Sequence, residues 1–390
     1  MNNGQHTINQ HYIPCCVLKF FKESDDVYNK NQKRIFHVIH RSGKVFPSTV
    51  DRIMSGEYFY EHPNFALNRV EDELKLYEDW YSPRHGKFVA LVDKYNDGHA
   101  KFSEVKNEAF KLVEPMILMH LRSGAMMYEL NFWQREHRTM NGIYQMLERV
   151  RNRNYTTAFA QTLINFYDFC IIQSNNKDFI ISDQFLSSAA LSFKAQFMNA
   201  TNRSIGQKDL IVLLPLSKSY YLCFYDGNKP DYIRANQLRK LNEIQTNEIN
   251  KMIINNSYMQ SAAPSFDLLY TAVKHYKDAS PRGFYYGGGG AELRKEVFFY
   301  DDDEKIWDFV RFFHSHVEFR DVKKNELCPC GTGKVFGDCC RYKVRAFDNF
   351  MDRVEIQSKN KYLNPYTIDG CFFRELNITE YHQRGKVTDE

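Results

Sequence analysis

The sequence predicts an α+β fold: a mixed helical and antiparallel-strand body followed by a small cysteine-rich module near the C-terminus. Short β-branched and aromatic runs occur both near the N-terminus and in the middle of the chain. Hydrophobic residues at helical spacing fill the region between them. Four cysteines then fall within thirteen residues, after the last of these elements.

Length and composition set the class of protein. The chain has 390 residues, which suggests one large body with a smaller appendage. Its 43% hydrophobic and 26% charged residues are typical of a globular protein and exclude a disordered one. No run approaches the roughly 18 apolar residues of a membrane span, and the N-terminal residues lack a secretion signal. We therefore expect a cytoplasmic protein that makes no membrane contact.

The predicted strands form two groups. Residues 33–50, KRIFHVIHRSGKVFPSTV, predict two strands joined at Ser42 and Gly43, because a connection that contains glycine suits a tight hairpin. Aromatic and β-branched runs bounded by Asp, Gly, Ser or Lys predict further strands at residues 179–183, 209–217 and 220–227.

Helices are expected between and after the strands. Val70, Leu74 and Tyr77 recur at helical spacing, and few helix breakers interrupt residues 102–169. We also expect helices at residues 233–257 and 301–316, separated by a glycine-rich boundary or mobile loop at residues 282–295.

The strongest chemical signal is the segment LCPCGTGKVFGDCCR. Its Cys328, Cys330, Cys339 and Cys340 can surround one ion tetrahedrally, and zinc is the metal that four thiolates favour. Four free or disulfide-linked cysteines are the alternative. The spacing resembles the SEC-C motif, a small zinc-binding module. A closed four-thiolate site has no open position for a substrate, so the zinc would be structural or serve recognition.

This cysteine module is basic. Residues 320–345 contain seven Lys or Arg and three acidic residues, a net charge of +4 that equals the formal charge of the whole chain. Resemblance to the SEC-C motif implies docking on a chaperone, a ribosome or nucleic acid, and a basic surface fits an acidic partner. An ordinary solvated surface is the alternative.

A second resemblance covers the body. QHYIPCCVLKFF resembles the opening of the family known as domain of unknown function 4238, and further matches follow in family order over residues 9–275. Positions that match the family include Glu71, Glu78, Arg122 and Asp183. The expected organisation is a body at 1–280, a glycine-rich loop and connecting helix at 281–317, the zinc module at 318–345 and a tail at 346–390.

Five residues of the body could support catalysis. His11 could act as a general base, Arg122 could hold a phosphate with two hydrogen bonds, and Asp183 could complete a site for a divalent metal or a proton. Glu71 and Glu78 are two helical turns apart, so both lie on one face about 10 Å apart. The alternative is structural, because such a Glu and Arg often form a buried ion pair and such a histidine is often a core residue.

Two hypotheses from different classes follow. The first is a hydrolase of phosphodiesters, of the kind used in phage defence or as a toxin, delivered to its target by the zinc module. The second is an adaptor that docks on a ribosome, a chaperone or nucleic acid and catalyses no reaction. No Cys-His or Ser-His-Asp spacing favours covalent catalysis.

Overall fold

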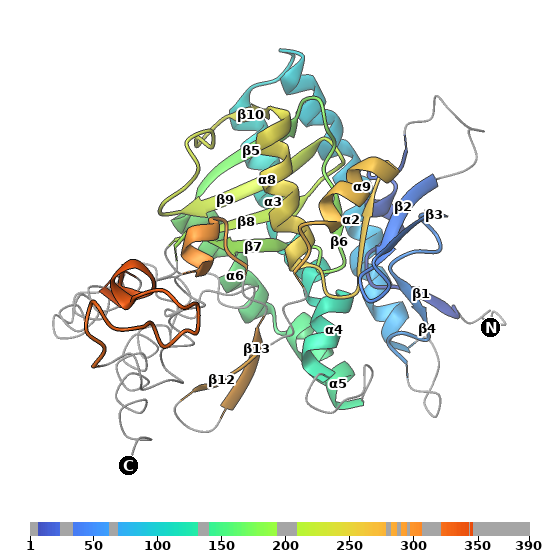
Figure 1. Ribbon diagram of the computed structural model, residues 1–390. Helices are drawn as coiled ribbons and strands as arrows, with labels where there is room; N and C mark the ends of the chain where they lie inside the picture. The colour runs from blue at the N-terminus through green and yellow to red at the C-terminus, as the bar shows by residue number, and fades with distance from the viewer. Residues whose placement is uncertain are drawn as a thin grey trace, which may run out of the picture.

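The computed structural model describes residues 7–23, 34–61, 69–131, 140–192, 209–277, 282–286, 290–294, 297–305, 321–342 and 344–345. Two sheets and a set of helices make up an α+β body (Figure 1). The predicted fold class is confirmed, because antiparallel pairing dominates both sheets. Among the described residues, no helix is long and apolar enough to cross a membrane.

The larger sheet has five strands in the order β10-β5-β9-β8-β7. Strand β10 pairs parallel with β5, and the other three pairs, β5 with β9, β9 with β8 and β8 with β7, are antiparallel. The strands are β5 (Asp168–Ser174), β7 (Ser187–Ala190), β8 (Leu210–Pro215), β9 (Tyr220–Asp226) and β10 (Leu238–Leu241). Strand β8 is buried along its whole length, as a central strand covered on both faces should be.

The smaller sheet joins segments that are far apart in the sequence. Its order is β3-β2-β11-β6, so the N-terminal hairpin pairs with strands from the second half of the chain. The strands are β2 (Arg34–Ile39), β3 (Lys44–Thr49), β6 (Ile181–Ser182) and β11 (Gln260–Ala263). Gly43 has φ +63 in the β2–β3 connection, which confirms that this turn uses the conformational freedom of glycine. A separate short ladder joins β1 (Asn9–His11) to β4 (Ser55–Glu57).

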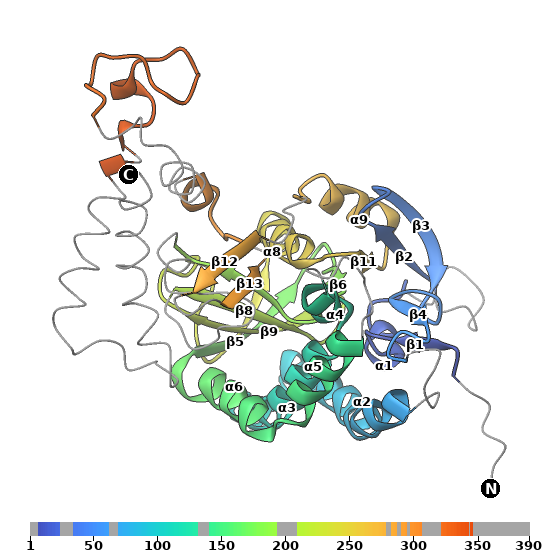
Figure 2. The same cartoon turned by 90° about the horizontal axis from the view of Figure 1, so that it is seen from below.

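Helices cover both faces of the five-stranded sheet. Figure 2 shows α3 and α6 on one side of it and α8 on the other. On the first side, the ring of Phe110 in α3 lies 5.3 Å from the ring of Phe169 in β5. The helices are α1 (Cys15–Leu18), α2 (Arg69–Asn96), α3 (Phe102–Leu121), α4 (Gly124–Asn131), α5 (Met140–Arg151), α6 (Arg153–Phe166), α8 (Glu243–Asn256) and α9 (Phe266–Val273).

Two predicted helix boundaries were wrong, and one segment expected as a loop contains strands. The helix expected to end at residue 169 ends at Phe166, and strand β5 follows at once. The helix expected from residue 233 begins at Glu243, after strand β10, because Asn242 and Gln245 form a capping box there. The glycine-rich segment contains a hairpin of β12 (Arg282–Tyr286) and β13 (Gly290–Arg294) instead of a loop alone.

The C-terminal module has its own small core. Cys328, Phe336 and Cys340 are buried together, separately from the core of the body. In both ribbon views the described residues of this module lie away from the two sheets (Figures 1 and 2). Residues 301–305 are helical. The remainder of the predicted connecting helix and the tail at 346–390 lie outside the described residues.

Candidate metal centre and buried arginine network

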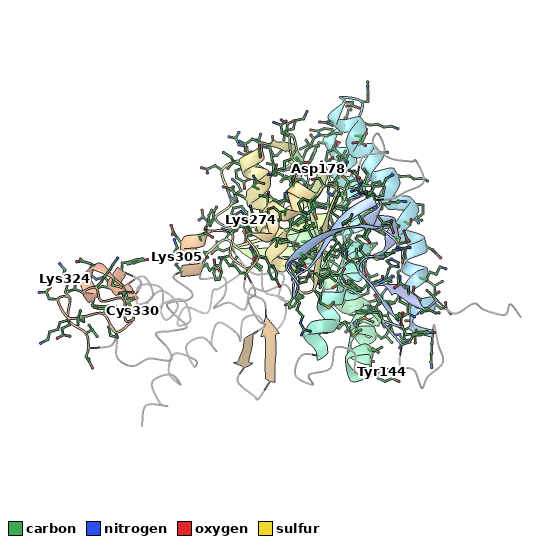
Figure 3. All side chains as sticks on the ribbon, turned by 45° about the vertical axis from the view of Figure 1, so that its right-hand side comes forward. Tyr144, Asp178, Lys274, Lys305, Lys324 and Cys330 are labelled. Atoms are coloured by element: carbon green, nitrogen blue, oxygen red, sulfur yellow. The ribbon has the colours of Figure 1, made fainter. Side chains whose placement is uncertain are left out.

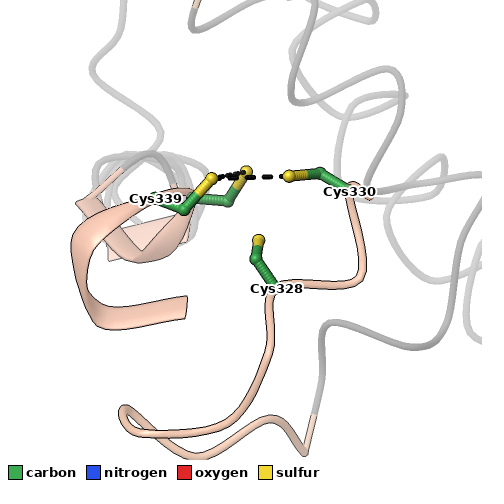
Figure 4. A group of neighbouring side chains, drawn as sticks. Cys328, Cys330 and Cys339 are labelled. Atoms are coloured by element: carbon green, nitrogen blue, oxygen red, sulfur yellow. Dashed lines mark hydrogen bonds between the residues drawn. The ribbon is translucent and has the colours of Figure 1, made fainter. Parts of the chain in front are cut away.

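The four cysteines of the module converge on one point. Their sulfur atoms all lie within 4.8 Å of one another. The Sγ atoms of Cys330 and Cys339 are 3.4 Å apart, and those of Cys339 and Cys340 are 3.8 Å apart. Sulfurs around a tetrahedral zinc at 2.3 Å stand about 3.8 Å from each other, so the donors fit this ion. Figure 4 shows the labelled cysteines with their sulfurs directed toward one another.

Local backbone structure holds these sulfurs together. Gly331 has φ +77 and Gly333 has φ +73, conformations that favour glycine and let the chain reverse after the first two cysteines. The returning segment is fixed by the bond from the amide of Cys328 to the carbonyl of Lys334, at 2.8 Å. The 3-10 helix η3 (Phe336–Asp338) then presents Cys339 and Cys340.

Thr332 supports the thiolate form of Cys330. Its hydroxyl lies 3.2 Å from the sulfurs of both Cys330 and Cys339. This contact is the main cause that lowers the pKa of Cys330 to about 6, whereas burial raises the pKa of Cys328 and of Cys340. Zinc binds thiolates, so a hydroxyl that favours a thiolate also favours the metal. Zinc held by Cys328, Cys330, Cys339 and Cys340 would fix the fold of the loop between them.

The surface of the module carries basic, acidic and apolar side chains, with Asp321, Glu326 and Asp338 exposed among the basic residues. Lys323, Lys324 and Lys334 are exposed, and Figure 3 shows Lys324 on the same small unit as Cys330. Leu327 and Val335 pair across a short antiparallel bridge and are 71% and 36% exposed. The described part of the module therefore exposes lysines, carboxylates and two apolar side chains to solvent.

A different polar group, Arg122, is buried in the body. It follows the last residue of α3 and is 2% exposed. Its guanidinium donates to the carbonyl oxygens of His11 at 2.8 Å and Leu74 at 3.4 Å, to the Glu78 carboxylate at 3.4 Å and to the Tyr60 hydroxyl at 3.4 Å. Tyr60 in turn donates to the carbonyl oxygen of Arg122 at 2.8 Å. The side chain therefore ties β1, α2 and α3 together.

Two carboxylates, Glu78 and Glu71, lie near this guanidinium, and a third, Glu61, lies near Glu71. Glu78 forms the ion pair, while Glu61 is buried and accepts hydrogen bonds from the amides of Val70 and Glu71 at the beginning of α2. Burial raises the pKa of Glu71, and attraction to Arg122 only partly offsets that. Its Oε2 atom is buried without a hydrogen-bond partner. Glu71 is therefore the least satisfied of these carboxylates.

His11 joins the group through its backbone. Its carbonyl oxygen accepts the bond from Arg122, whereas its ring points to a different side chain: Nε2 lies 3.3 Å from Sγ of Cys15. Burial lowers the pKa of His11, and the Arg122 charge acts in the same direction. The sequence analysis found no Cys-His pair here because a spacing of four residues across a turn resembles no known pattern.

Asp183 has a separate set of partners. It is fully buried, and its carboxylate accepts hydrogen bonds from the hydroxyl of Ser257 and the amides of Tyr258, Met259 and Gln260, all between 2.6 and 2.9 Å. Burial raises its pKa against the effect of these bonds. The residue organises the turn between α8 and β11, as a buried carboxylate with a full set of donors does.

The structure thus brings three of the five predicted catalytic residues to the guanidinium of a fourth, Arg122: the carboxylates of Glu71 and Glu78 and the backbone of His11. Asp183 instead holds the turn between α8 and β11. Tyr60, which forms two hydrogen bonds with Arg122, was missed as a site residue. Beyond the four cysteines, no further cluster of three His, Cys, Asp or Glu that could hold a metal occurs among the described residues. A catalytic role for the five residues, and a second metal, remain predictions.

Comparison with known proteins supports both resemblances. The model of the family described as Protein of unknown function (DUF4238) matches residues 9–263, and that of the SEC-C motif matches residues 325–341. The first match spans most of the chain, and the second contains all four candidate zinc ligands. No curated protein and no solved structure matches the chain.

Proposed function

Because the chain belongs to the family described as Protein of unknown function (DUF4238), whose description names no activity, we propose its function from its own side chains. We propose that it is an adaptor that binds RNA through a zinc-organised C-terminal module. The observation that carries the proposal is the exposed basic surface built around the four converging cysteines.

The chemistry of this surface suits RNA. Exposed lysines can neutralise phosphates, and an exposed aromatic ring such as Tyr342, which is 59% exposed, can stack on an unpaired base. Lys324 lies just before the first zinc ligand, and Lys334 lies in the loop between Cys330 and Cys339. Backbone hydrogen bonds from the amide of Cys328 to the carbonyl oxygen of Lys334 and from the amide of Gly337 to the carbonyl oxygen of Lys324 join the two segments. Zinc held by the four cysteines would add to these bonds and keep the basic residues in one arrangement.

The candidate catalytic residues of the body favour the adaptor hypothesis over the hydrolase hypothesis. A catalytic arginine has to reach a phosphate, yet Arg122 is 2% exposed and directs its nitrogen atoms to carbonyl, hydroxyl and carboxylate oxygens within the protein. Asp183 is also fully occupied by four donors. Cleavage of phosphodiesters would need both residues to change partners.

The test measures binding of fluorescently labelled single-stranded RNA to the full chain by anisotropy, with zinc present and after chelation. We expect binding that weakens as salt increases and that falls at least about tenfold on chelation. The variant Lys324→Glu/Lys334→Glu should weaken binding by a similar factor. Lys44→Glu/Lys240→Glu makes the same change in net charge at exposed lysines of the body and should have little effect.

Other outcomes reject the proposal. Equal losses in the two double variants would mean that overall charge, and not the module, attracts RNA. Binding to an acidic protein but not to RNA would identify a different partner class. Cleavage of the RNA in the presence of a divalent metal, lost in Glu78→Gln, would favour the hydrolase hypothesis instead.

A further inference from the structure

The contact between His11 and Cys15 lies in the body and is independent of the zinc module. Cys15 begins helix α1 directly after Pro14, and its Sγ lies 3.3 Å from Nε2 of the His11 ring and 3.5 Å from the carbonyl oxygen of Val50. Both side chains are half-buried, so solvent reaches the pair. A thiol and an imidazole at this separation can exchange a proton.

The backbone that carries the His11 ring is fixed independently of the thiol. The backbone of His11 pairs with Ser55 in the short β1–β4 ladder, and its carbonyl oxygen accepts the hydrogen bond from Arg122 at 2.8 Å. Burial is the main cause that lowers the pKa of the ring, and the Arg122 charge adds to it. Hydrogen bonding to the backbone of Val50 and the nearby Asp51 raise the pKa but do not offset burial. The neutral ring, which can accept a proton, is therefore favoured at neutral pH.

The neighbouring thiol provides a natural comparison. Cys16 is also half-buried, but burial and the nearby charge of Glu78 raise its pKa to about 12. Two adjacent cysteines of similar exposure thus have opposite surroundings: one has a base at its sulfur, and the other has a carboxylate nearby. Reactivity of a thiol depends on the ease with which it loses its proton, so the two should react at different rates.

We propose that Cys15 and His11 form a reactive thiol site that exchanges with low-molecular-weight disulfides. In this reaction Sγ of Cys15 attacks one sulfur of the disulfide while its proton passes to Nε2 of His11. The sulfur–sulfur bond of the reagent breaks, and the departing thiolate takes that proton from the imidazolium. The products are a mixed disulfide on Cys15 and one free small thiol, so atoms and electrons balance.

The experiment uses the full chain with zinc and glutathione disulfide at neutral pH, followed by trypsin digestion without reductant. The peptide 1–19 contains both thiols, so each is followed alone: Cys16→Ser leaves Cys15, and Cys15→Ser leaves Cys16. Mass spectrometry of this peptide over time gives the rate of glutathione addition to each thiol. The combination of His11→Asn with Cys16→Ser then removes the base while it keeps the backbone carbonyl that Arg122 binds.

We expect Cys15 to react at least about tenfold faster than Cys16, and His11→Asn to lower the rate at Cys15 by about tenfold or more, as loss of a general base does. Thermal melting of each variant checks that the body is folded. If His11→Asn does not fold, the unsubstituted chain still tests the proposal. Fragmentation of its peptide 1–19 in the mass spectrometer then shows which of the two thiols carries glutathione. Equal rates at Cys15 and Cys16, or an unchanged rate in a folded His11→Asn variant, would overturn the proposal.

Discussion

At the scale of single residues, the surroundings of Arg122 distinguish a structural arginine from a catalytic one. The guanidinium bonds to backbone carbonyls from two segments and to the side chains of Tyr60 and Glu78. Lysine keeps the positive charge but cannot reach several acceptors in one plane. Because Arg122 has several acceptors, we expect the substitution Arg122→Lys to reduce the stability of the protein.

Arg122→Lys should lower the free energy of unfolding by about 2 to 4 kcal/mol, because buried acceptors lose their donors. Arg151→Lys is the matched control: Arg151 pairs with Glu73, but its side chain is 52% exposed, so the change should stay within about 1 kcal/mol. Denaturant unfolding of both variants measures the difference. Similar values for the two would show that the buried network contributes little.

The stability of the protein should depend on pH through the ionisation of Glu71. Burial raises the pKa of this carboxyl in the folded state, so the protonated form is favoured and ionisation reduces stability as pH rises from the unfolded pKa through the folded one. Glu71→Gln removes this loss. The variant should therefore melt at a higher temperature than the unsubstituted chain at pH 7.

The difference should shrink as the pH falls below about 4.5, where both states of the unsubstituted chain carry a protonated Glu71. Melting curves between pH 4 and pH 8 test this. A Glu71→Gln variant that is less stable at pH 7 would mean that attraction to Arg122 outweighs burial. A more stable variant would mark Glu71 as a residue retained for function at some cost in stability.

At the scale of secondary-structure elements, Gly124 decides how closely α4 approaches the N-terminal segment. A Cβ atom at this position would lie 2.8 Å from the ring of Tyr12 and 2.9 Å from Met259, too close for either contact. At Gly86, within α2, the nearest atom to an added Cβ is in the ring of Phe20 at 3.8 Å, an ordinary contact. The two glycines therefore serve different purposes.

Gly124→Ala should destabilise the protein by about 1 to 3 kcal/mol, because Tyr12 or the helix has to move. Gly86→Ala should stabilise it by about 0.5 to 1 kcal/mol, because alanine is the better helix former and the space is available. Chemical denaturation gives both values. The same sign for the two substitutions would contradict the packing described here.

The elements that could be predicted from sequence are those with local signals. Hairpin β2–β3 was predicted because Gly43 marks its turn, and strands β8 and β9 because their runs are apolar and bounded. Strand β10 was missed because its parallel partner β5 is about seventy residues earlier in the chain, so long-range pairing defines it. Asn242, whose capping box begins α8, was a local signal that the sequence analysis did not use.

The candidate sites also divide into one that is local in the sequence and others that only long-range contacts assemble. The four cysteines could be identified from spacing alone, because all of them belong to one short loop. The group around Arg122 gathers residues from β1, α2 and the end of α3, and spacing along the chain does not show which of them meet. The turn that Asp183 organises was not foreseen, because its donors lie about 75 residues later.

At the scale of the whole molecule, two separate hydrophobic cores indicate two units that unfold separately. The core of the body extends over both sheets, while Cys328, Phe336 and Cys340 form the small core of the module. A unit of this size has too little apolar surface to fold alone and depends on its metal. Loss of zinc should therefore affect the module and leave the body intact.

Cys339→Ser should unfold the module while the main melting transition of the body stays within about 2 °C of its original temperature. Limited proteolysis should then cut residues 321–345 rapidly and spare the body. Cys16→Ser, which removes a thiol from the body, serves as the control and should leave the module resistant. Loss of the main transition in Cys339→Ser would show that the two units are not separable.

One zinc ion held by four sulfurs is the feature on which the proposed function of the module depends most. Elemental analysis combined with X-ray absorption at the zinc edge measures both the amount of metal and its ligands in the purified chain. We predict one zinc per chain with four sulfur neighbours at about 2.3 Å, and loss of the metal in Cys339→Ser. Absence of zinc from the chain, or a metal surrounded by nitrogen and oxygen instead of sulfur, would contradict the account.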